Sequence, residues 1–189
     1  DVLRCAAGRR KRPTSASVVW DEIRSRNGIE AATPAWAGKT FAVWVQDLML
    51  SLAEALSASH AQNIVHCDLK PTNVLVTSEG KPTLVDFNVA FRQNAVASPA
   101  NVGGTLPYMA PEQIRAFAGE GFSTIGPQTD VYGLAATIYE LLTGKLPFGA
   151  APPADDGVQM LLEQRRNRPG SIRATNPQVS TEFDELILE

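Results

Sequence analysis

The feature that most restricts the fold of this chain is a long amphipathic helix that runs directly into a proline-bearing polar loop. From Phe41 to Leu56, apolar residues recur every three or four positions, which predicts a helix with one buried face that ends near Gln62. The segment 66–73 follows, and Pro71 within it interrupts any helix or central strand. The sequence therefore predicts a loop at this point.

A small hairpin is predicted directly after the loop. Short apolar strands at 74–76 and 83–85 flank a glycine-containing turn at 79–81. The triplet Asp86-Phe87-Asn88 follows, and a polar stretch of small residues then runs from 92 to 104. A long loop of this kind usually carries function.

Helices dominate the second half of the chain. Gly144 suits the C-cap of the central helix, with Pro147 just beyond it. Ser180 suits the N-cap of the last helix. The predicted helices span 111–117, 129–142 and 158–166, and a final one starts near residue 180.

The first forty residues are expected to be irregular, apart from a short helix at 18–26. A basic run at 9–12 is interpreted as a solvated loop face, with binding to an acidic partner as the alternative. The chain starts with Asp1, and its last residues, 186–189, have the pattern of a helix interior. We therefore expect a fragment that is cut at both ends.

The composition is that of one globular domain, and it excludes several functional classes. The 189 residues are 44% hydrophobic and 20% charged. The net charge of -3 provides no basic field for nucleic acid. Cys5 and Cys67 follow no metal or disulfide spacing, which favours a reducing compartment. The longest apolar stretch, 131–142, is too short to span a bilayer, so no membrane segment is expected.

Two motifs in the middle of the chain resemble the signature pair of protein kinases, His-Arg-Asp-Leu-Lys-Pro-x-Asn and Asp-Phe-Gly. They stand here at 66–73 as His-Cys-Asp-Leu-Lys-Pro-Thr-Asn and at 86–88 as Asp-Phe-Asn. Further runs in family order and spacing extend the resemblance over about 41–189: Gly104-Thr105, Ala110-Pro111-Glu112, Thr129–Leu134 and Leu141–Phe148. The Pro-Glu-Gln at 111–113 is most similar to bacterial, Hanks-type serine/threonine kinases.

The resemblance implies an α+β protein kinase-like fold, of which this chain would be the mainly α-helical C-terminal lobe with a small β-hairpin. We expect residues 41–189 to form that lobe, truncated before its last helix, and residues 1–40 to be an irregular interlobe or insertion segment. The sequence shows no glycine-rich phosphate loop and no Val-Ala-x-Lys strand, so the N-terminal lobe is expected to be absent. The fragment alone is then expected to be marginally stable and inactive.

The resemblance also assigns the catalytic residues. Phosphoryl transfer depends on positioning and charge neutralisation, and Asp68 is expected to accept the proton of the substrate hydroxyl. Lys70 would offset charge on the transferred group and bind ATP, and a lysine at this position is typical of serine/threonine kinases rather than tyrosine kinases. Thr105 is expected to hydrogen-bond both residues and to shape the acceptor site.

Asn73 and Asp86 are the expected ligands of ATP-bound magnesium. Their oxygens are the hard donors that magnesium prefers, and manganese could replace it. The phosphates of ATP and water would complete the coordination shell.

Three further residues are expected to be structural. His66 is expected to pack beneath Phe87, although a loop histidine could also be imagined as a general base. Asp130 is expected to accept backbone N–H groups of the catalytic loop, because a buried carboxylate needs such partners. Glu112 normally pairs with an arginine that lies beyond the end of this chain, so it is expected to lack that partner here.

Two positions depart from the family pattern. Cys67 replaces an arginine that in many kinases pairs with a phosphorylated activation loop, so we predict activity that does not require phosphorylation of Ser98 or its neighbours. Inert packing is the favoured role of Cys67, with redox sensing as the alternative. Asn88 replaces glycine, and asparagine is the next most tolerant residue of left-handed backbone conformations.

The function that the resemblance implies is ATP-dependent phosphorylation of serine or threonine in a protein substrate, by a cytoplasmic signalling kinase whose parent chain could carry a membrane anchor elsewhere. A pseudokinase that acts as a binding or scaffolding module is the main alternative. The survival of all four polar residues, Asp68, Lys70, Asn73 and Asp86, favours the active enzyme. Small-molecule phosphotransferases share part of the pattern, but they lack the Ala-Pro-Glu segment that this chain has at 110–112.

Overall fold

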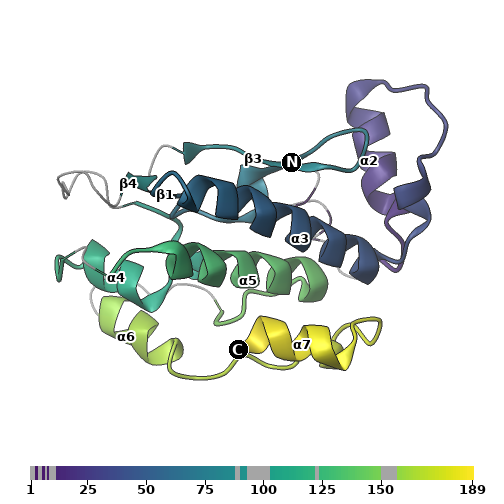
Figure 1. Cartoon of the computed structure of the whole chain (residues 1–189). Coiled ribbons are helices and arrows are strands. Elements are labelled where there is room, and N and C mark those ends of the chain that lie inside the picture. Colours follow the sequence, from purple (N-terminus) through teal and green to yellow (C-terminus); the bar gives the residue numbers. More distant parts are fainter. Residues whose placement is uncertain are drawn as a thin grey trace.

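The computed structural model describes residues 3, 6, 8, 12–87, 90–92, 103–121, 124–149 and 157–189. The fold is mostly helical, with two small antiparallel sheets (Figure 1). The helices are α2 (Ser17–Asn27), α3 (Phe41–His60), α4 (Pro111–Phe117), α5 (Pro127–Thr143), α6 (Gly157–Gln164) and α7 (Thr181–Leu188). Short 3-10 turns are η1 (Ala35–Gly38), η2 (Pro71–Asn73), η5 (Leu106–Tyr108) and η7 (Ile172–Ala174), and the strands are β1 (Ile64–Val65), β2 (Val74–Val76), β3 (Pro82–Leu84) and β4 (Phe91–Arg92).

The core of the molecule is the packing of α3 against α5, which lie side by side (Figure 1). The apolar stripe predicted for α3 is the buried face: Phe41, Val45, Leu48, Leu52 and Leu56 are all at most 3% exposed. Thr40 caps this helix by accepting a hydrogen bond from the amide of Val43. Five apolar side chains withdrawn from water on one helix are a main source of stability here.

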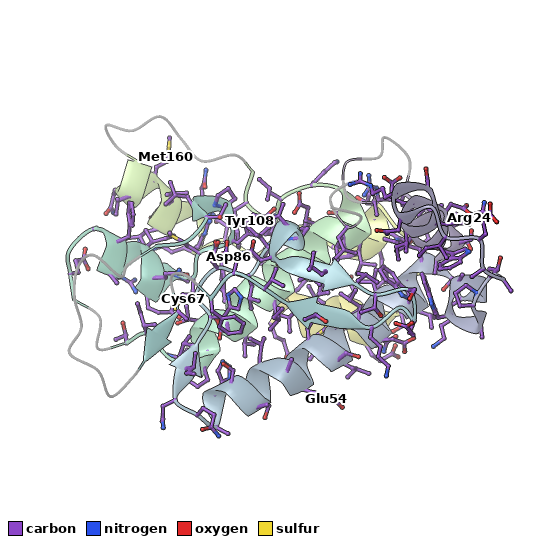
Figure 2. All side chains as sticks on the ribbon, turned by 90° about the horizontal axis from the view of Figure 1, so that it is seen from above. Arg24, Glu54, Cys67, Asp86, Tyr108 and Met160 are labelled. Carbon is purple, nitrogen blue, oxygen red and sulfur yellow. The ribbon has the colours of Figure 1, made fainter. Side chains whose placement is uncertain are left out.

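Helix α3 also has the length and apolar composition of a membrane-crossing helix, which the sequence analysis did not notice. Within the described ranges, it is the one helix that does. Its buried face contacts α5 and β3 as a core helix of a globular lobe does, whereas side chains such as Glu54 project outward (Figure 2).

Helix α5 approaches the loop 66–73 closely because residue 133 has no side chain. A Cβ added at Gly133 would lie 3.1 Å from the Cβ of Leu69, so glycine lets the helix backbone approach the loop. The helix ends as predicted at Gly144, which has the left-handed φ of 72° and donates its amide to the carbonyl of Glu140.

The predicted hairpin is confirmed as β2 and β3, in the register Val74 opposite Leu84. A second antiparallel pair, β1 with β4, was not predicted. Each of its strands is two residues long, too short for any alternation of apolar and polar residues to be read. The two sheets hold the chain on both sides of the segment 66–73.

The predicted helix near the start of the chain is confirmed as α2, and residues 1–40 are less irregular than expected. Val19, Trp20 and Ile23 of α2 are buried in the same core as α3 and α5. The ring of Trp36, in η1, stacks on Trp44 of α3 with a centroid separation of 5.8 Å. This part of the chain is thus packed onto the lobe rather than laid over its surface.

Candidate active site

Asp68 is the centre of a compact polar cluster on the loop between β1 and β2. One carboxylate oxygen, Oδ1, accepts a hydrogen bond from the hydroxyl of Thr105 at 2.8 Å. The other, Oδ2, accepts from the ammonium of Lys70 at 2.7 Å and from the amide of Asn73 at 3.0 Å. The ammonium of Lys70 also donates to Thr105 at 2.8 Å, so the cluster is closed. Four predicted site residues are thereby brought together from two distant parts of the sequence.

The environment of Asp68 keeps its carboxylate ionised. Burial raises the pKa of this carboxyl, but hydrogen bonds from Lys70, Thr105 and Asn73, together with the positive charge of Lys70, outweigh burial and lower the pKa overall. Because the pKa is lowered in the folded protein, the associated stability is complete above the unfolded value of about 3.9 and is lost as the pH falls through the folded value. A proton acceptor at this position is therefore available at neutral pH.

Asp86 lies next to this cluster, at the end of the hairpin. The amide of Val85 donates to the carbonyl of Asn73 at 3.0 Å. Because Asp86 is the next residue after Val85, this hydrogen bond holds its backbone close to that of Asn73. Asp86 has a positive φ of 67°, a conformation that is uncommon outside glycine and short polar residues such as asparagine and aspartate. Seen from above, Asp86 lies in the middle of the molecule with Cys67 and Tyr108 (Figure 2).

The donor set of Asn73 and Asp86 fits a hard cation that brings other ligands with it. Asn73 donates its amide nitrogen to the backbone carbonyl of Asp68 at 2.9 Å, which orients the amide, and its oxygen accepts a long hydrogen bond from the hydroxyl of Thr72 at 3.4 Å. The described residues contain no group of three or more His, Cys, Asp or Glu side chains that could enclose a metal. One amide oxygen and one carboxylate match magnesium, which usually keeps waters and takes substrate phosphates as ligands.

Asp130 anchors the loop 66–73 to α5. Its carboxylate accepts the backbone amides of His66 and Cys67, both at 2.8 Å, and it is 1% exposed. The ring nitrogen Nε2 of His60, at the end of α3, lies 2.7 Å from the same carboxylate. Cys67 has a positive φ of 65°, and two charge-assisted hydrogen bonds at this point hold the loop in that strained conformation.

His66 is enclosed rather than placed for proton transfer to a substrate. Its Nδ1 accepts the amide of Asp68, so its Nε2 is the protonated nitrogen and donates to the carbonyl of Val85 at 3.1 Å. The ring is fully buried and its centroid lies 4.4 Å from that of Phe87. With both nitrogens engaged, the imidazole links the loop to the segment that carries Asp86.

Glu112 has a partner of a different kind from the arginine that the sequence analysis described. Its carboxylate accepts a hydrogen bond from the hydroxyl of Thr129 at 2.7 Å, and the residue is only partly buried. Burying an unpaired carboxylate costs free energy, and that cost is reduced for Glu112 by this hydrogen bond and by its partial exposure. The contact ties α4 to the first turn of α5.

Two residues of the site were missed by the sequence analysis. His60 has no local pattern around it, and only the fold brings it to Asp130. Gln113 is 2% exposed, and its amide nitrogen donates to the carbonyls of Cys67, at 2.5 Å, and Gly103, at 2.9 Å. The signal for Gln113 was its place in the Pro-Glu-Gln run, which was read only as a family mark.

Gly104 should not tolerate a side chain, because the hydrogen bonds of Gln113 to Cys67 and Gly103 leave no room for one. Its φ is 135°, and an added Cβ would lie 2.6 Å from the amide nitrogen of Gln113 and 2.9 Å from the carbonyl of Cys67. We expect Gly104→Ala to lower the free energy of unfolding by about 2 kcal/mol more than Gly119→Ala, measured by denaturant titration. Gly119 is the matched control, since it has a φ of 91° and no described atom within 4 Å of an added Cβ. An equal loss in the free energy of unfolding for both variants would show that the close packing of Gln113 and Cys67 around Gly104 does not matter for stability.

Cys67 packs among apolar side chains. Val65, Ala116 and Ile125 form a small buried cluster with it. The predicted independence from loop phosphorylation stays a prediction. Asn88 and Ser98 lie outside the described residues, so the expectations for them stay predictions.

Comparison with known proteins shows similarity to protein kinases, in which this arrangement of polar residues is expected. A sequence model of the protein kinase domain matches residues 38–189. The chain is 29% identical over 175 residues, 90% of its length, to the probable serine/threonine-protein kinase PknB of Corynebacterium glutamicum. It is 31% identical over 147 residues, 76% of its length, to serine/threonine-protein kinase PknB of Mycolicibacterium smegmatis, and 29% identical over 147 residues to that of Mycobacterium tuberculosis.

These matches cover 26%, 22% and 22% of the respective relatives, so the chain spans about a quarter of their length. The family match itself covers most of the chain and includes every residue of the polar cluster. Residues 38–189 therefore identify this chain as a member of the protein kinase domain family, of the Hanks type.

Proposed function

We propose that the protein containing this chain transfers the γ-phosphoryl group of ATP to serine or threonine hydroxyls of a protein substrate. The observation that carries the proposal is the closed cluster of Asp68, Lys70, Thr105 and Asn73, whose hydrogen bonds are all between 2.7 and 3.0 Å. A base, a cation and a metal-ligand amide are thus held in mutual contact, as phosphoryl transfer requires.

The acceptor hydroxyl has a place to bind beside the cluster. An open cavity of about 430 Å³ is lined by Lys70, Pro71, Thr72, Thr105, Tyr108, Glu140 and Gly8. Asp68 is buried and does not line this cavity, but its carboxylate is bonded to Thr105, which does, so we expect the substrate hydroxyl to approach it beside Thr105. The hydroxyl of Tyr108 donates to Glu140 at 2.5 Å and gives the cavity a fixed polar wall.

Each residue of the cluster then has a defined task. Asp68 accepts the hydroxyl proton as the substrate oxygen bonds to the γ-phosphorus and the bond from that phosphorus to ADP breaks. Lys70 offsets negative charge on the phosphoryl group, and Thr105 orients both side chains through its hydroxyl. Asn73 and Asp86 would hold magnesium, which supplies charge neutralisation on the ATP phosphates when bound.

The proposed function also bears on the domain division of the chain, its binding partner and its location. We propose that residues 41–189 form the C-terminal lobe of a kinase domain and that residues 1–40 precede it as an interlobe segment packed on the same core. The partner would be a protein, with no nucleic acid, since the net charge of -3 provides no overall basic field. The apolar face of α3 is engaged within the lobe, which supports a cytoplasmic kinase domain.

The test is direct transfer of label by the intact natural protein that contains these residues. It is incubated with γ-labelled ATP, magnesium and a mixture of serine- and threonine-containing proteins, and the products are hydrolysed to identify phosphoamino acids. We expect phosphoserine or phosphothreonine to form only when magnesium or manganese is present. Tight binding of ATP with no transfer to any protein would favour the pseudokinase alternative instead.

A further inference from the structure

Arg165 reaches from the end of α6 to the segment that follows Thr105. Its Nη2 donates to the carbonyl of Leu106 at 2.9 Å and to the carbonyl of Pro107 at 3.2 Å. Both carbonyls belong to η5, a single 3-10 turn whose own bonds are short-range. One side chain from a distant helix thus holds two consecutive peptide groups of this turn.

The guanidinium of Arg165 is fixed by aromatic rings as well. Its central carbon lies 4.9 Å from the centroid of the Phe148 ring, and that ring is stacked on Tyr132 at 6.4 Å with an interplanar angle of 6°. Burial lowers the pKa of Arg165 and raises that of Tyr132 to about 12. Desolvating a guanidinium is costly unless partners replace water, and here the two carbonyls and the ring face replace part of it, whereas Nε is buried without a hydrogen-bond partner among the described residues.

The turn that Arg165 holds forms one wall of the acceptor cavity. At its first end, Thr105 is bonded to Asp68 and Lys70. At its other end, Tyr108 is bonded to Glu140. Thr105 and Tyr108 both line the cavity. Arg165 therefore anchors the middle of this wall, and its hydrogen bonds to described residues do not include any to the polar cluster.

We propose that Arg165 is a positioning residue that sets the shape of the acceptor wall and thereby the affinity for the protein substrate. The proposal rests on the proposed kinase function, but it concerns substrate binding rather than the transfer step. Without Arg165, the carbonyls of Leu106 and Pro107 lose their donor and the turn samples other conformations. Thr105 and Asp68 keep their direct bond, so the transfer step is left largely intact.

The experiment compares three variants of the intact protein. We expect Arg165→Met to raise KM for the protein substrate about tenfold, with kcat and KM for ATP changed less than twofold. Arg165→Lys keeps a charged donor but loses the planar fork, and should give an intermediate KM. Arg166→Met is the matched control, because the neighbouring Arg166 is exposed and pairs only with Glu163 among the described residues.

A second measurement separates this proposal from the proposed function. The amides of Tyr108 and Met109 bond within the turn, so their hydrogen exchange should accelerate in Arg165→Met and not in Arg166→Met. Equal substrate KM for these two variants, in an active protein, would overturn the proposal and leave the kinase function standing. If the wild type transfers no phosphate, the kinase function fails, and unchanged exchange at residues 108–109 would then also overturn the anchoring role.

Discussion

Asp68→Asn is expected to lower kcat of the intact protein by about 10²–10⁴-fold, with the affinity for ATP changed only slightly. The substitution removes the proton acceptor, and it also replaces one carboxylate oxygen, which accepts hydrogen bonds, with an amide group that donates them. The amide nitrogen would face either the donors Lys70 and Asn73, at the Oδ2 position, or the hydroxyl of Thr105, at the Oδ1 position, so at least one of these hydrogen bonds is lost. The measurement is steady-state phosphorylation of a protein substrate at saturating ATP.

The matched control for this prediction is Asp21→Asn on α2. The side chain of Asp21 is 63% exposed and pairs with Arg24 only at 3.8 Å, so the same chemical change there should leave kcat unaltered. Equal activity of the Asp68 and Asp21 variants would remove Asp68 from the mechanism. The loss of kcat caused by Asp68→Asn should be about the same at pH 6 and at pH 8, because the lowered pKa keeps Asp68 of the wild type ionised over that range.

Asp130→Ala is expected to produce the largest loss of stability. It leaves the buried amides of His66 and Cys67 without an acceptor and removes the partner of His60. Each unsatisfied buried donor costs about 1–3 kcal/mol, so we expect the opening free energy of segment 64–69 to fall by about 3–5 kcal/mol. Hydrogen–deuterium exchange of the intact protein, followed by mass spectrometry, measures it at this segment.

Asp47→Ala is the control for the stability measurement. Asp47 pairs with Lys39 at 2.5 Å, but both side chains are nearly half exposed, and a surface pair of this kind contributes about 0–1 kcal/mol. We expect exchange at 64–69 to be unchanged in this variant. If segment 64–69 exchanged no faster in Asp130→Ala than in Asp47→Ala, the hydrogen bonds of Asp130 would not be what stabilises the strained loop at Cys67.

Much of this fold could be predicted because its signals are local. The apolar stripe of α3, the glycine at the end of α5 and the Ser180 cap of α7 each depend on neighbouring residues, and each is present as expected. Strand pairing between β1 and β4 depends on contacts between distant segments, and two-residue strands carry no periodicity. That pairing therefore could not be read from the sequence.

The same distinction holds in the candidate site. The positions of Asp68, Lys70 and Asn73 follow from one short motif with fixed internal spacing. By contrast, Gln113 reaches Cys67 and Arg165 reaches Leu106 across long sequence separations, through side chains whose reach depends on how α4 and α6 pack. A glutamine or an arginine on a helix is ordinarily a surface residue, so neither was a candidate before the fold was known.

The proposed arrangement of Asp68, Asn73 and Asp86 around a single phosphate–metal cleft is tested most directly by calorimetric titration of ATP into the intact protein, with and without magnesium. For the wild type, magnesium should strengthen ATP binding by about tenfold or more, and Asp86→Asn should abolish that gain without changing binding in its absence. A variant in which magnesium still strengthens binding as much as in the wild type would contradict the assignment of Asp86 to this cleft.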